Sequence, residues 1–154
     1  MVSKIAVDIS NKVISERIAI AEGIFQITKK TYFLIQNKQI QKGDVFENAR
    51  LAAIHAVKQT PFLVFMCHPI PIYQIKVSFE TQDLSDHAEI KINVQVKTQA
   101  KTGCEIEALA GVMNGLLNIF DLVKMYEKDS SGNYPHSKIT DIHVISKTKS
   151  PVSG

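Results

Sequence analysis

The chain has 154 residues, of which 45% are hydrophobic and 21% are charged, and its formal net charge is +3. Domains hold about 100–200 residues, so we expect residues 1–154 to form one domain, and the average composition excludes a mostly disordered chain. No uncharged apolar run approaches the roughly 18 residues that span a bilayer, and the first residues lack the apolar core of a secretory leader. We therefore expect a cytoplasmic protein that does not enter a membrane.

Cysteine and charge patterns narrow the class further. Cys67 and Cys104 lie far apart and form no CxxC pair, which favours reduced thiols over a disulfide framework or a zinc site. The basic excess is small and no block of five like charges occurs, whereas nucleic-acid-binding proteins usually have a clustered basic face. Charge alone leaves a small anionic ligand and an RNA partner both open.

The first half of the chain predicts an arm, a strand and a helix. Residues 1–12 are typical of an N-terminal arm, and residues 17–27 alternate loosely, which indicates a strand with one buried face. Residues 31–36 are ambiguous. Asp44, with a glutamate three residues later, is a helix-start signal. The helix that follows is expected to end at Pro61, because the residue before a proline avoids helical backbone angles.

Residues 73–81 and 89–97 alternate apolar and polar side chains, which predicts a β-hairpin whose polar loop is 82–87. Tyr73 and Phe79 fall on the apolar face of the first of these strands, so we expect both rings in the core. The opposite faces carry Lys and Glu, which indicates a side that meets water or another subunit.

The strongest predicted element is a long helix. Thr102 and Glu105 are expected to form a capping box at its start, and the helix runs to about Lys128. Its apolar side chains are spaced so as to form one stripe: Ile106, Leu109, Ala110, Met113, Leu116, Leu117, Phe120 and Val123. A last alternating segment, residues 138–148, closes the chain as a strand.

The predicted order is strand, helix, strand, strand, helix, strand. This order indicates the α+β class and a ferredoxin-like split βαβ arrangement, in which an antiparallel sheet carries its helices on one face. The fold hosts many unrelated functions, so function has to be sought in particular groups of residues.

The first such group is the loop Met66-Cys67-His68, which is followed by two prolines. The prolines stiffen the loop, and a histidine held there can act as acid, base or phosphate donor near neutral pH. A structural turn with a buried thiol remains an equal alternative.

Acids and a lysine of the long helix form the second group. Glu105 and Glu107 near its start suit the helix dipole as solvated carboxylates. Asp121 lies within about 40° of Glu107 around the helix, so the two can line one groove, although they are too far apart to share a proton. Asp121 and Lys124 are neighbours at i, i+3, which favours a solvated ion pair, while partial burial would make them an acid–base pair.

Lys42 and Gly43, just before the first helix, are a fair phosphate site but are far short of a P-loop. The motifs GxxxxGK[ST], GxGxxG, HExxH and GxSxG do not occur. Their absence argues against the common NTPase, dinucleotide-binding, zinc-protease and hydrolase classes.

Taken together, these motifs resemble one family in their order and spacing, from about Ala6 to Asp129. It is the molybdenum cofactor biosynthesis protein C family, the cyclic pyranopterin monophosphate synthases. The resemblance implies a homohexamer, a trimer of dimers, with active sites at subunit interfaces. It also implies a lyase that converts (8S)-3′,8-cyclo-7,8-dihydroguanosine 5′-triphosphate, derived from GTP, to cyclic pyranopterin monophosphate and pyrophosphate.

The resemblance also implies roles for single residues. Asp121, Lys124 and Lys42 match catalytic positions of the family. Eight further residues match substrate-binding positions: Arg17, Met66, Cys67, His68, Glu105, Ile106, Glu107 and Lys147. Two departures are a longer segment at 130–141 and the absence of a glycine-rich end around 146–150, which leaves Lys147 and Lys149 as alternatives.

No metal-ligand spacing occurs, so we expect no built-in metal or cofactor, and any magnesium would enter only through the substrate phosphates. The alternative function is a ferredoxin-like ligand- or RNA-binding module, which would stack bases on aromatic side chains of its central strands. For the synthase, we expect no nucleic-acid partner and sites built by two neighbouring subunits. In that arrangement Lys42 would come from one subunit and Asp121 from the other.

Overall fold

The structure is a computed structural model that describes residues 6–153, so residues 1–5 of the predicted arm and Gly154 of the predicted domain lie outside it. Seven elements follow one another along this part of the chain: β1 (Ser15–Ile27), α1 (Lys29–Gln36), α2 (Val45–Leu63), β2 (Gln74–Asp83), β3 (Ala88–Ala100), α3 (Glu105–Glu127) and β4 (Lys138–Ser150). The ambiguous residues 31–36 belong to the short helix α1.

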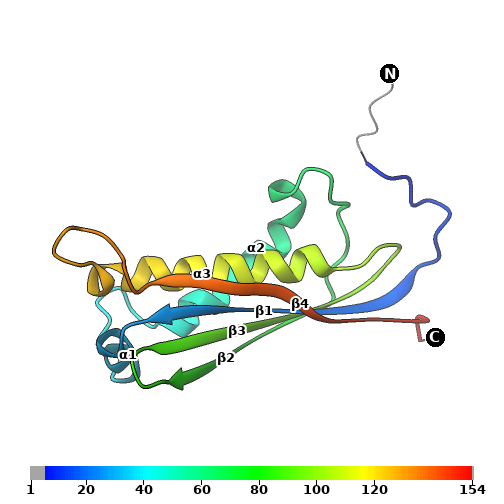
Figure 1. Ribbon diagram of the computed structural model, residues 1–154. Helices are drawn as coiled ribbons and strands as arrows, with labels where there is room; N and C mark the ends of the chain where they lie inside the picture. Colours follow the sequence, from blue (N-terminus) through cyan, green and yellow to red (C-terminus); the bar gives the residue numbers. More distant parts are fainter. Residues whose placement is uncertain (1–5, 154) are drawn as a thin grey trace.

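The four strands form one antiparallel sheet in the order β2-β3-β1-β4. β1 pairs with β3 along its whole length, from Ser15 opposite Ala100 to Ile27 opposite Ala88. The long helices α2 and α3 lie together on one face of this sheet (Figure 1). The predicted α+β class and ferredoxin-like split βαβ arrangement are therefore confirmed.

The core lies between the two central strands and α3. Every second residue of β3 is buried, and so is every second residue of β1 apart from the half-buried Arg17, which is the alternation expected of strands with one covered face. Gly115 of α3 lets the layers approach closely: a Cβ there would lie 2.5 Å from Cδ1 of Ile92 and 3.4 Å from the carbonyl oxygen of Ala49. A small residue at this position thus brings α3 against both α2 and the sheet.

The predicted end of α2 at Pro61 is wrong, because the helix continues to Leu63. The hydroxyl of Thr60 donates to the carbonyl of Ala56 at 2.9 Å, and the amide of Val64 donates to the carbonyl of Thr60 at 2.9 Å. Pro61 has no N–H to donate to the preceding turn, but its φ is fixed in the helical range, and the hydrogen bonds of Thr60 and Val64 on either side of it continue the turn. The last turn therefore forms despite it.

The predicted capping box of α3 is also wrong. The N-cap is Cys104, and its side chain makes no capping hydrogen bond. The carboxylate of Glu105 binds Lys147 instead, at 2.5 Å. A charged partner from β4 is stronger than the neutral backbone N–H that a capping box would offer.

The prediction that one apolar stripe of α3 is buried is correct at Leu116 and Val123 but not along the whole length of the helix. Met113 and Leu117 are 53% and 56% exposed, and the remaining core-facing positions include Ala108, Val112, Gly111, Gly115 and Ile119. Within residues 6–153, α3 alone is long and apolar enough to cross a membrane, but half of its apolar stretch is buried inside the fold, as in the core helix of a globular domain.

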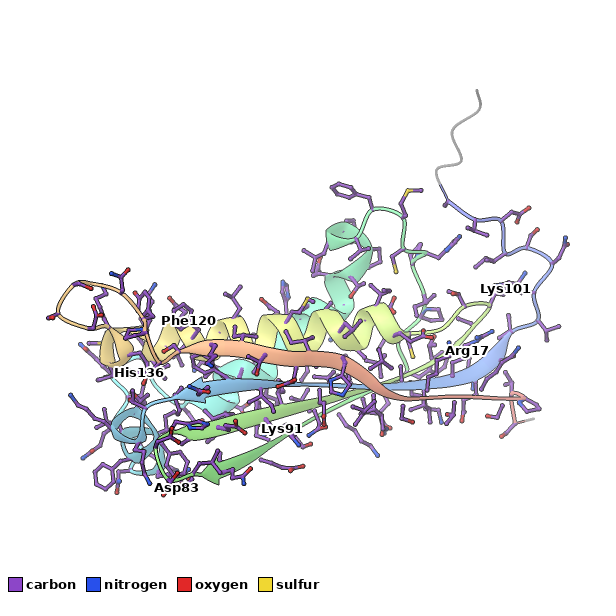
Figure 2. All side chains as sticks on the ribbon, in the orientation of Figure 1. Arg17, Asp83, Lys91, Lys101, Phe120 and His136 are labelled. Atoms are coloured by element: carbon purple, nitrogen blue, oxygen red, sulfur yellow. The ribbon has the colours of Figure 1, made fainter. Side chains whose placement is uncertain are left out.

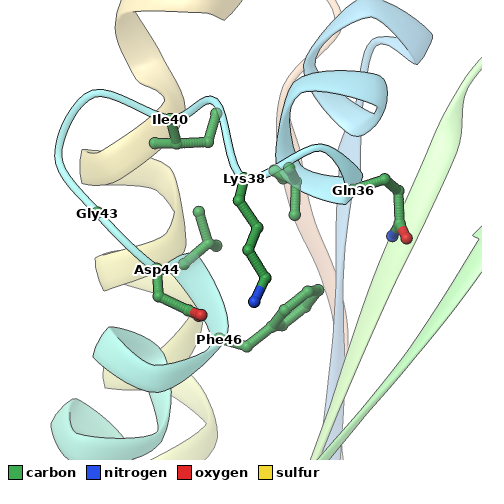
Figure 3. A pocket seen from close by; sticks show the side chains of 8 residues that line it. Gln36, Lys38, Ile40, Gly43, Asp44 and Phe46 are labelled. Carbon is green, nitrogen blue, oxygen red and sulfur yellow. The ribbon is translucent and has the colours of Figure 1, made fainter.

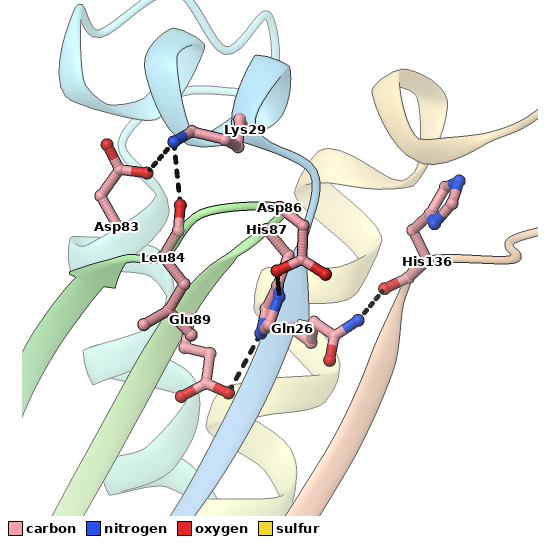
Figure 4. Close-up of polar contacts among 8 residues, drawn as sticks. All are labelled: Gln26, Lys29, Asp83, Leu84, Asp86, His87, Glu89 and His136. Carbon is pink, nitrogen blue, oxygen red and sulfur yellow. Dashed lines mark hydrogen bonds and ion pairs between the residues drawn. The ribbon is translucent and has the colours of Figure 1, made fainter.

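Polar contacts tie the hairpin end of the sheet to α1 (Figure 4). Lys29 Nζ lies 2.9 Å from both the Asp83 carboxylate and the Leu84 carbonyl. His87 contacts the carboxylate of Asp86 at 2.7 Å, and this hydrogen bond raises the pKa of the imidazole. The β2–β3 connection is shorter than the predicted loop, because the strands extend to Asp83 and from Ala88.

Candidate functional site

Lys42, Asp121 and Lys124 form one group, here called the Asp121 cluster. The Asp121 carboxylate accepts a hydrogen bond from Lys42 Nζ at 2.8 Å on one oxygen and lies 3.0 Å from Lys124 Nζ on the other. Lys42 Nζ also donates to the backbone carbonyl of Asp121 at 3.0 Å. The structure therefore brings the three predicted catalytic residues together within one chain.

Two local features place Lys42 on α3. Gly43 has a φ of +111°, a backbone conformation that favours glycine, and it turns the chain into the start of α2. The amide of Gln41 donates to the hydroxyl of Tyr126 at 2.9 Å. Tyr126 was not among the predicted site residues, since nothing in the sequence connects it with a loop 85 residues earlier.

The electrostatics of the Asp121 cluster are those of an exposed network. Hydrogen bonds from Lys42 and then Lys124 hold the pKa of Asp121 below its usual value, and the hydrogen bond to Asp121 raises the pKa of Lys124. All three side chains are partly exposed. The structure therefore shows the solvated ion pair rather than a desolvated acid–base pair.

Arg17, Glu105 and Lys147 form a second group, here called the Arg17 cluster, around a cavity of about 160 Å³. Lys149 also lines this cavity and lies opposite Arg17 in the β1–β4 register, so both lysines that the sequence left as alternatives are present. Arg17 Nε is buried and has no hydrogen-bond partner within the described residues. Burial tends to raise the pKa of Glu105, but the hydrogen bond from Lys147 and the nearby Arg17 outweigh it and lower that pKa.

The third group joins the proline loop to the first turn of α3. Glu107 is only 2% exposed, and its Oε1 accepts a hydrogen bond from the thiol of Cys67 at 3.6 Å. Its Oε2 is buried without a partner among the described residues. Burial raises the pKa of Glu107 and raises that of Cys67 to about 11. His68 Nε2 lies 2.8 Å from the carbonyl of Val7.

Met66 and Ile106, the remaining two predicted binding residues, are exposed side chains beside this third group in sequence. Neither side chain makes a polar contact among the described residues that would join it to the other predicted site residues. Their roles therefore remain predictions.

The Asp121 and Arg17 clusters lie at opposite ends of α3. Glu105 and Asp121 are separated by about 24 Å along the axis at 1.5 Å per residue. Figure 2 labels Arg17 near one end of the sheet and Phe120, the neighbour of Asp121, toward the other end. Neither Glu107 nor Asp121 borders the five pockets described within residues 6–153, so a common groove lined by both stays a prediction.

The expectation that Lys42 and Asp121 come from different subunits is wrong, because the two side chains contact each other in one chain. The sequence could not show this, since the contact joins residues 79 positions apart. A shared site would instead divide between the Asp121 cluster and the Arg17 cluster.

Other cavities lie outside these groups. The pocket of about 380 Å³ in Figure 3 is bordered by Lys38, Asp44 and Phe46, and of the phosphate site expected at Lys42 and Gly43 only Gly43 lines it. In the part of the chain that the structure describes, no three His, Cys, Asp or Glu side chains are placed to hold a metal ion together. Cys67 and Cys104 are free thiols.

Comparison with known proteins places the chain in context. The model of the MoaC family matches residues 6–150. The chain is 45% identical over 143 residues to a probable cyclic pyranopterin monophosphate synthase of Archaeoglobus fulgidus, covering 93% of this chain and 89% of that protein. It is 46% identical over 147 residues to a protein of the same name from Methanococcoides burtonii, covering 96% and 90%. A relative from Methanothermobacter thermautotrophicus, named a probable cyclic pyranopterin monophosphate synthase accessory protein, is 42% identical, covering 93% and 87%.

Proposed function

The chain belongs to the MoaC family, and we propose that it is a cyclic pyranopterin monophosphate synthase, a lyase of molybdenum cofactor biosynthesis. It converts (8S)-3′,8-cyclo-7,8-dihydroguanosine 5′-triphosphate to cyclic pyranopterin monophosphate and pyrophosphate. The observation that carries this proposal is identity of 45% and 46% to two proteins of that name over more than nine-tenths of the chain. The clusters of cations and carboxylates described above support it.

The Asp121 cluster is suited to proton transfer. Ring opening, ring closure and attack on a phosphate each need a proton to be given or taken. Asp121 is a weak base while two lysines bind its carboxylate. A phosphate that draws Lys42 away would remove the larger cause of the lowered pKa of Asp121 and make it a stronger base. Lys124, three residues along the same helix, is then the adjacent proton donor.

The Arg17 cluster is suited to phosphate. Arg17, Lys147 and Lys149 line one small cavity, and Arg17 Nε is buried without a partner among the described residues. A buried donor without a partner costs free energy until a ligand accepts from it. Phosphate oxygens are such acceptors, and guanidinium groups bind them well. We assign the triphosphate to this cluster, with Glu105 as the group that neutralises Lys147 in the free enzyme.

One small molecule does not span about 24 Å of helix, so we propose that each active site combines the Asp121 cluster of one subunit with the Arg17 cluster of another. Met113 lies halfway between Glu105 and Asp121 in sequence. A two-fold axis near Met113 and perpendicular to α3 would run two α3 helices antiparallel. Glu105 of each copy would then lie beside Asp121 of the other, because in an isologous contact residue i of one subunit meets residue j of its partner and j meets i.

The surface around Met113 supports this arrangement. An apolar groove of about 500 Å³ between α2 and α3 is lined by Phe62, Leu63, Met113 and Leu117, and Phe62 is 77% exposed. Contiguous exposed apolar surface of this kind marks an interaction site. We propose that a second copy covers it, within a homohexamer made as a trimer of dimers. We also propose that the enzyme is cytoplasmic and has no nucleic-acid partner and no built-in metal, so that any magnesium would enter only through the substrate phosphates.

The RNA-binding alternative has less support. Phe79 packs against Phe46 with 5.1 Å between ring centroids, and Arg50 lies 5.5 Å from the same ring, so Phe79 is not free to stack on a base. The expected core position of Tyr73 is wrong, because its side chain is 59% exposed. Tyr73 lies just before β2, and it is a single aromatic ring. RNA readers of this architecture stack two or three bases on strand aromatics.

The two functions are separated by one experiment. The purified protein is incubated with the cyclised triphosphate, and the products are measured as pyranopterin by mass spectrometry and as released pyrophosphate. The synthase forms both in equal amounts. A protein that forms neither, but shifts single-stranded RNA in a salt-dependent manner, is the binding module and not the enzyme.

A further inference from the structure

The buried carboxyl group of Glu107 is half satisfied. Its Oε1 accepts from Cys67, while its Oε2 is shielded from solvent and lacks a partner within the described residues. Buried polar atoms are almost always hydrogen-bonded, so one without a partner calls for a ligand or a special role. Glu107 lies in the first turn of α3, close to the Arg17 cluster through Glu105. Among the described residues, Cys67 is therefore the side-chain partner that orients this carboxyl group.

Cys67 is suited to act as a hydrogen-bond donor to this carboxyl group. Its pKa is raised to about 11 by burial first and by Glu107 second, so at neutral pH it carries its proton. The Sγ atom lies 3.6 Å from Glu107 Oε1 and 3.8 Å from the carbonyl oxygen of His68. The loop around Cys67 is held by the contact of His68 with Val7 and contains Pro69 and Pro71, which fix its backbone.

Two hydrogen-bond donors act on the Glu107 carboxylate: its own backbone amide, which has the larger effect, and the thiol of Cys67. Among the described residues, Glu105 on the same helix acts on Glu107 as a like charge and favours its protonated form. The thiol of Cys104, at the start of α3, is affected by Glu107 in the same sense as Cys67. The Cys67 hydrogen bond acts in the opposite direction on Glu107, because it stabilises the carboxylate.

We propose that Cys67 is a positioning residue: its thiol donates to Oε1 of Glu107 and so fixes the orientation of this carboxylate and keeps it ionised. Cys67 acts through Glu107 and does not itself touch the reacting atoms. The proposal rests on the proposed synthase function and adds to it how this thiol contributes to binding.

The test compares Cys67→Ala, which removes the donor, with Cys67→Ser, which restores an O–H at a slightly greater distance. We expect Cys67→Ala to lower kcat/KM about tenfold, the size of one lost hydrogen bond to a charged group, with most of the loss in KM. Its acid limb in the pH profile of kcat/KM moves to higher pH, because the carboxylate has lost a stabilising donor. Cys67→Ser recovers part of both effects.

The protonation state of Glu107 is measured independently of turnover. In protein carrying ¹³C-labelled glutamate, the carboxyl signal of Glu107, identified by its loss in Glu107→Gln, is titrated in the wild type and in both Cys67 variants. We expect the titration midpoint to rise in Cys67→Ala and to fall back in Cys67→Ser. Circular dichroism and light scattering confirm that all variants keep the wild-type fold and assembly.

An unchanged titration of Glu107 and an unchanged pH profile in Cys67→Ala would overturn the proposal. Equal losses in Cys67→Ala and Cys67→Ser with no titration shift would also overturn it, since they would show that the thiol only fills space. A wild-type protein that does not convert the cyclised triphosphate would refute the proposed function, whereas the titration would still decide whether Cys67 holds Glu107.

Discussion

Replacement of Glu127 by alanine should destabilise the protein more than any exposed acidic substitution. Glu127, the last residue of α3, is buried, and its carboxylate accepts from the amide and hydroxyl of Thr28 at 3.1 and 2.7 Å and from the hydroxyl of Ser137 at 2.7 Å. It therefore joins the end of α3 to the N-cap of α1 and to the start of β4. Hydrogen bonds to charged groups are worth about 1.5–3 kcal/mol each, and partial replacement by water reduces the sum, so we expect a loss of about 2–4 kcal/mol.

The free energy of unfolding is measured by urea titration at one fixed protein concentration, since assembly makes stability depend on concentration. For a domain of this size, the loss corresponds to a fall of about 5–15 °C in melting temperature. Glu127→Gln keeps one carbonyl oxygen for Thr28 and should therefore lose less stability. Glu80→Ala, at an exposed position of β2, should change the free energy of unfolding by no more than about 0.5 kcal/mol. If Glu127→Ala unfolds at the same urea concentration as Glu80→Ala, the three hydrogen bonds do not hold these elements together.

Three further outcomes are expected. Asp121→Asn and Lys124→Ala should keep a folded assembly by circular dichroism and light scattering but lose about 10²–10⁴-fold in turnover, the usual range for a lost acid or base; product formation at the wild-type rate in either variant would contradict their catalytic role. Light scattering at micromolar concentration should show an assembly larger than a dimer that Leu117→Lys makes smaller, whereas a fully active wild-type monomer would refute the proposed assembly. Asp86→Asn should lower the melting temperature at about pH 5.5 but not at about pH 8.5. The raised pKa of His87 in the folded protein stabilises the fold below the unfolded pKa, and this contribution disappears as pH rises through the folded pKa. Equal melting temperatures of variant and wild type at the lower pH would show that the pair contributes nothing.

Features encoded by neighbouring residues could be predicted from the sequence. Asp44 does cap α2, since its carboxylate accepts from the amide of Glu47 at 3.0 Å, three residues later. Ile75, Val77 and Phe79 do share the covered face of β2, because strand side chains alternate strictly. These signals depend on contacts within one turn or one strand.

Features that depend on distant contacts could not be predicted in the same way. α3 carries apolar side chains around much of its circumference, so the sequence did not reveal that Val112 faces the sheet while Met113 faces outward. Glu105 fits a capping box by spacing but contacts Lys147, 42 residues away, and Lys42 contacts Asp121 across 79 residues. The residues of the candidate site could thus be proposed from the motifs, but their separation into groups at different places in the fold could not.

The central claim is that each active site joins the Asp121 cluster of one subunit to the Arg17 cluster of another, and subunit mixing tests it most directly. Asp121→Ala and Lys147→Ala proteins, each inactive alone, are mixed in equal amounts, and subunit exchange is verified by mass. Random pairing gives about a quarter of sites with both clusters intact, so about a quarter of wild-type turnover should return. The matched control mixes Asp121→Ala with Lys42→Ala, which lie in the same cluster, and should recover nothing. No recovery in the first mixture after verified exchange, or recovery in the control, would contradict the shared site.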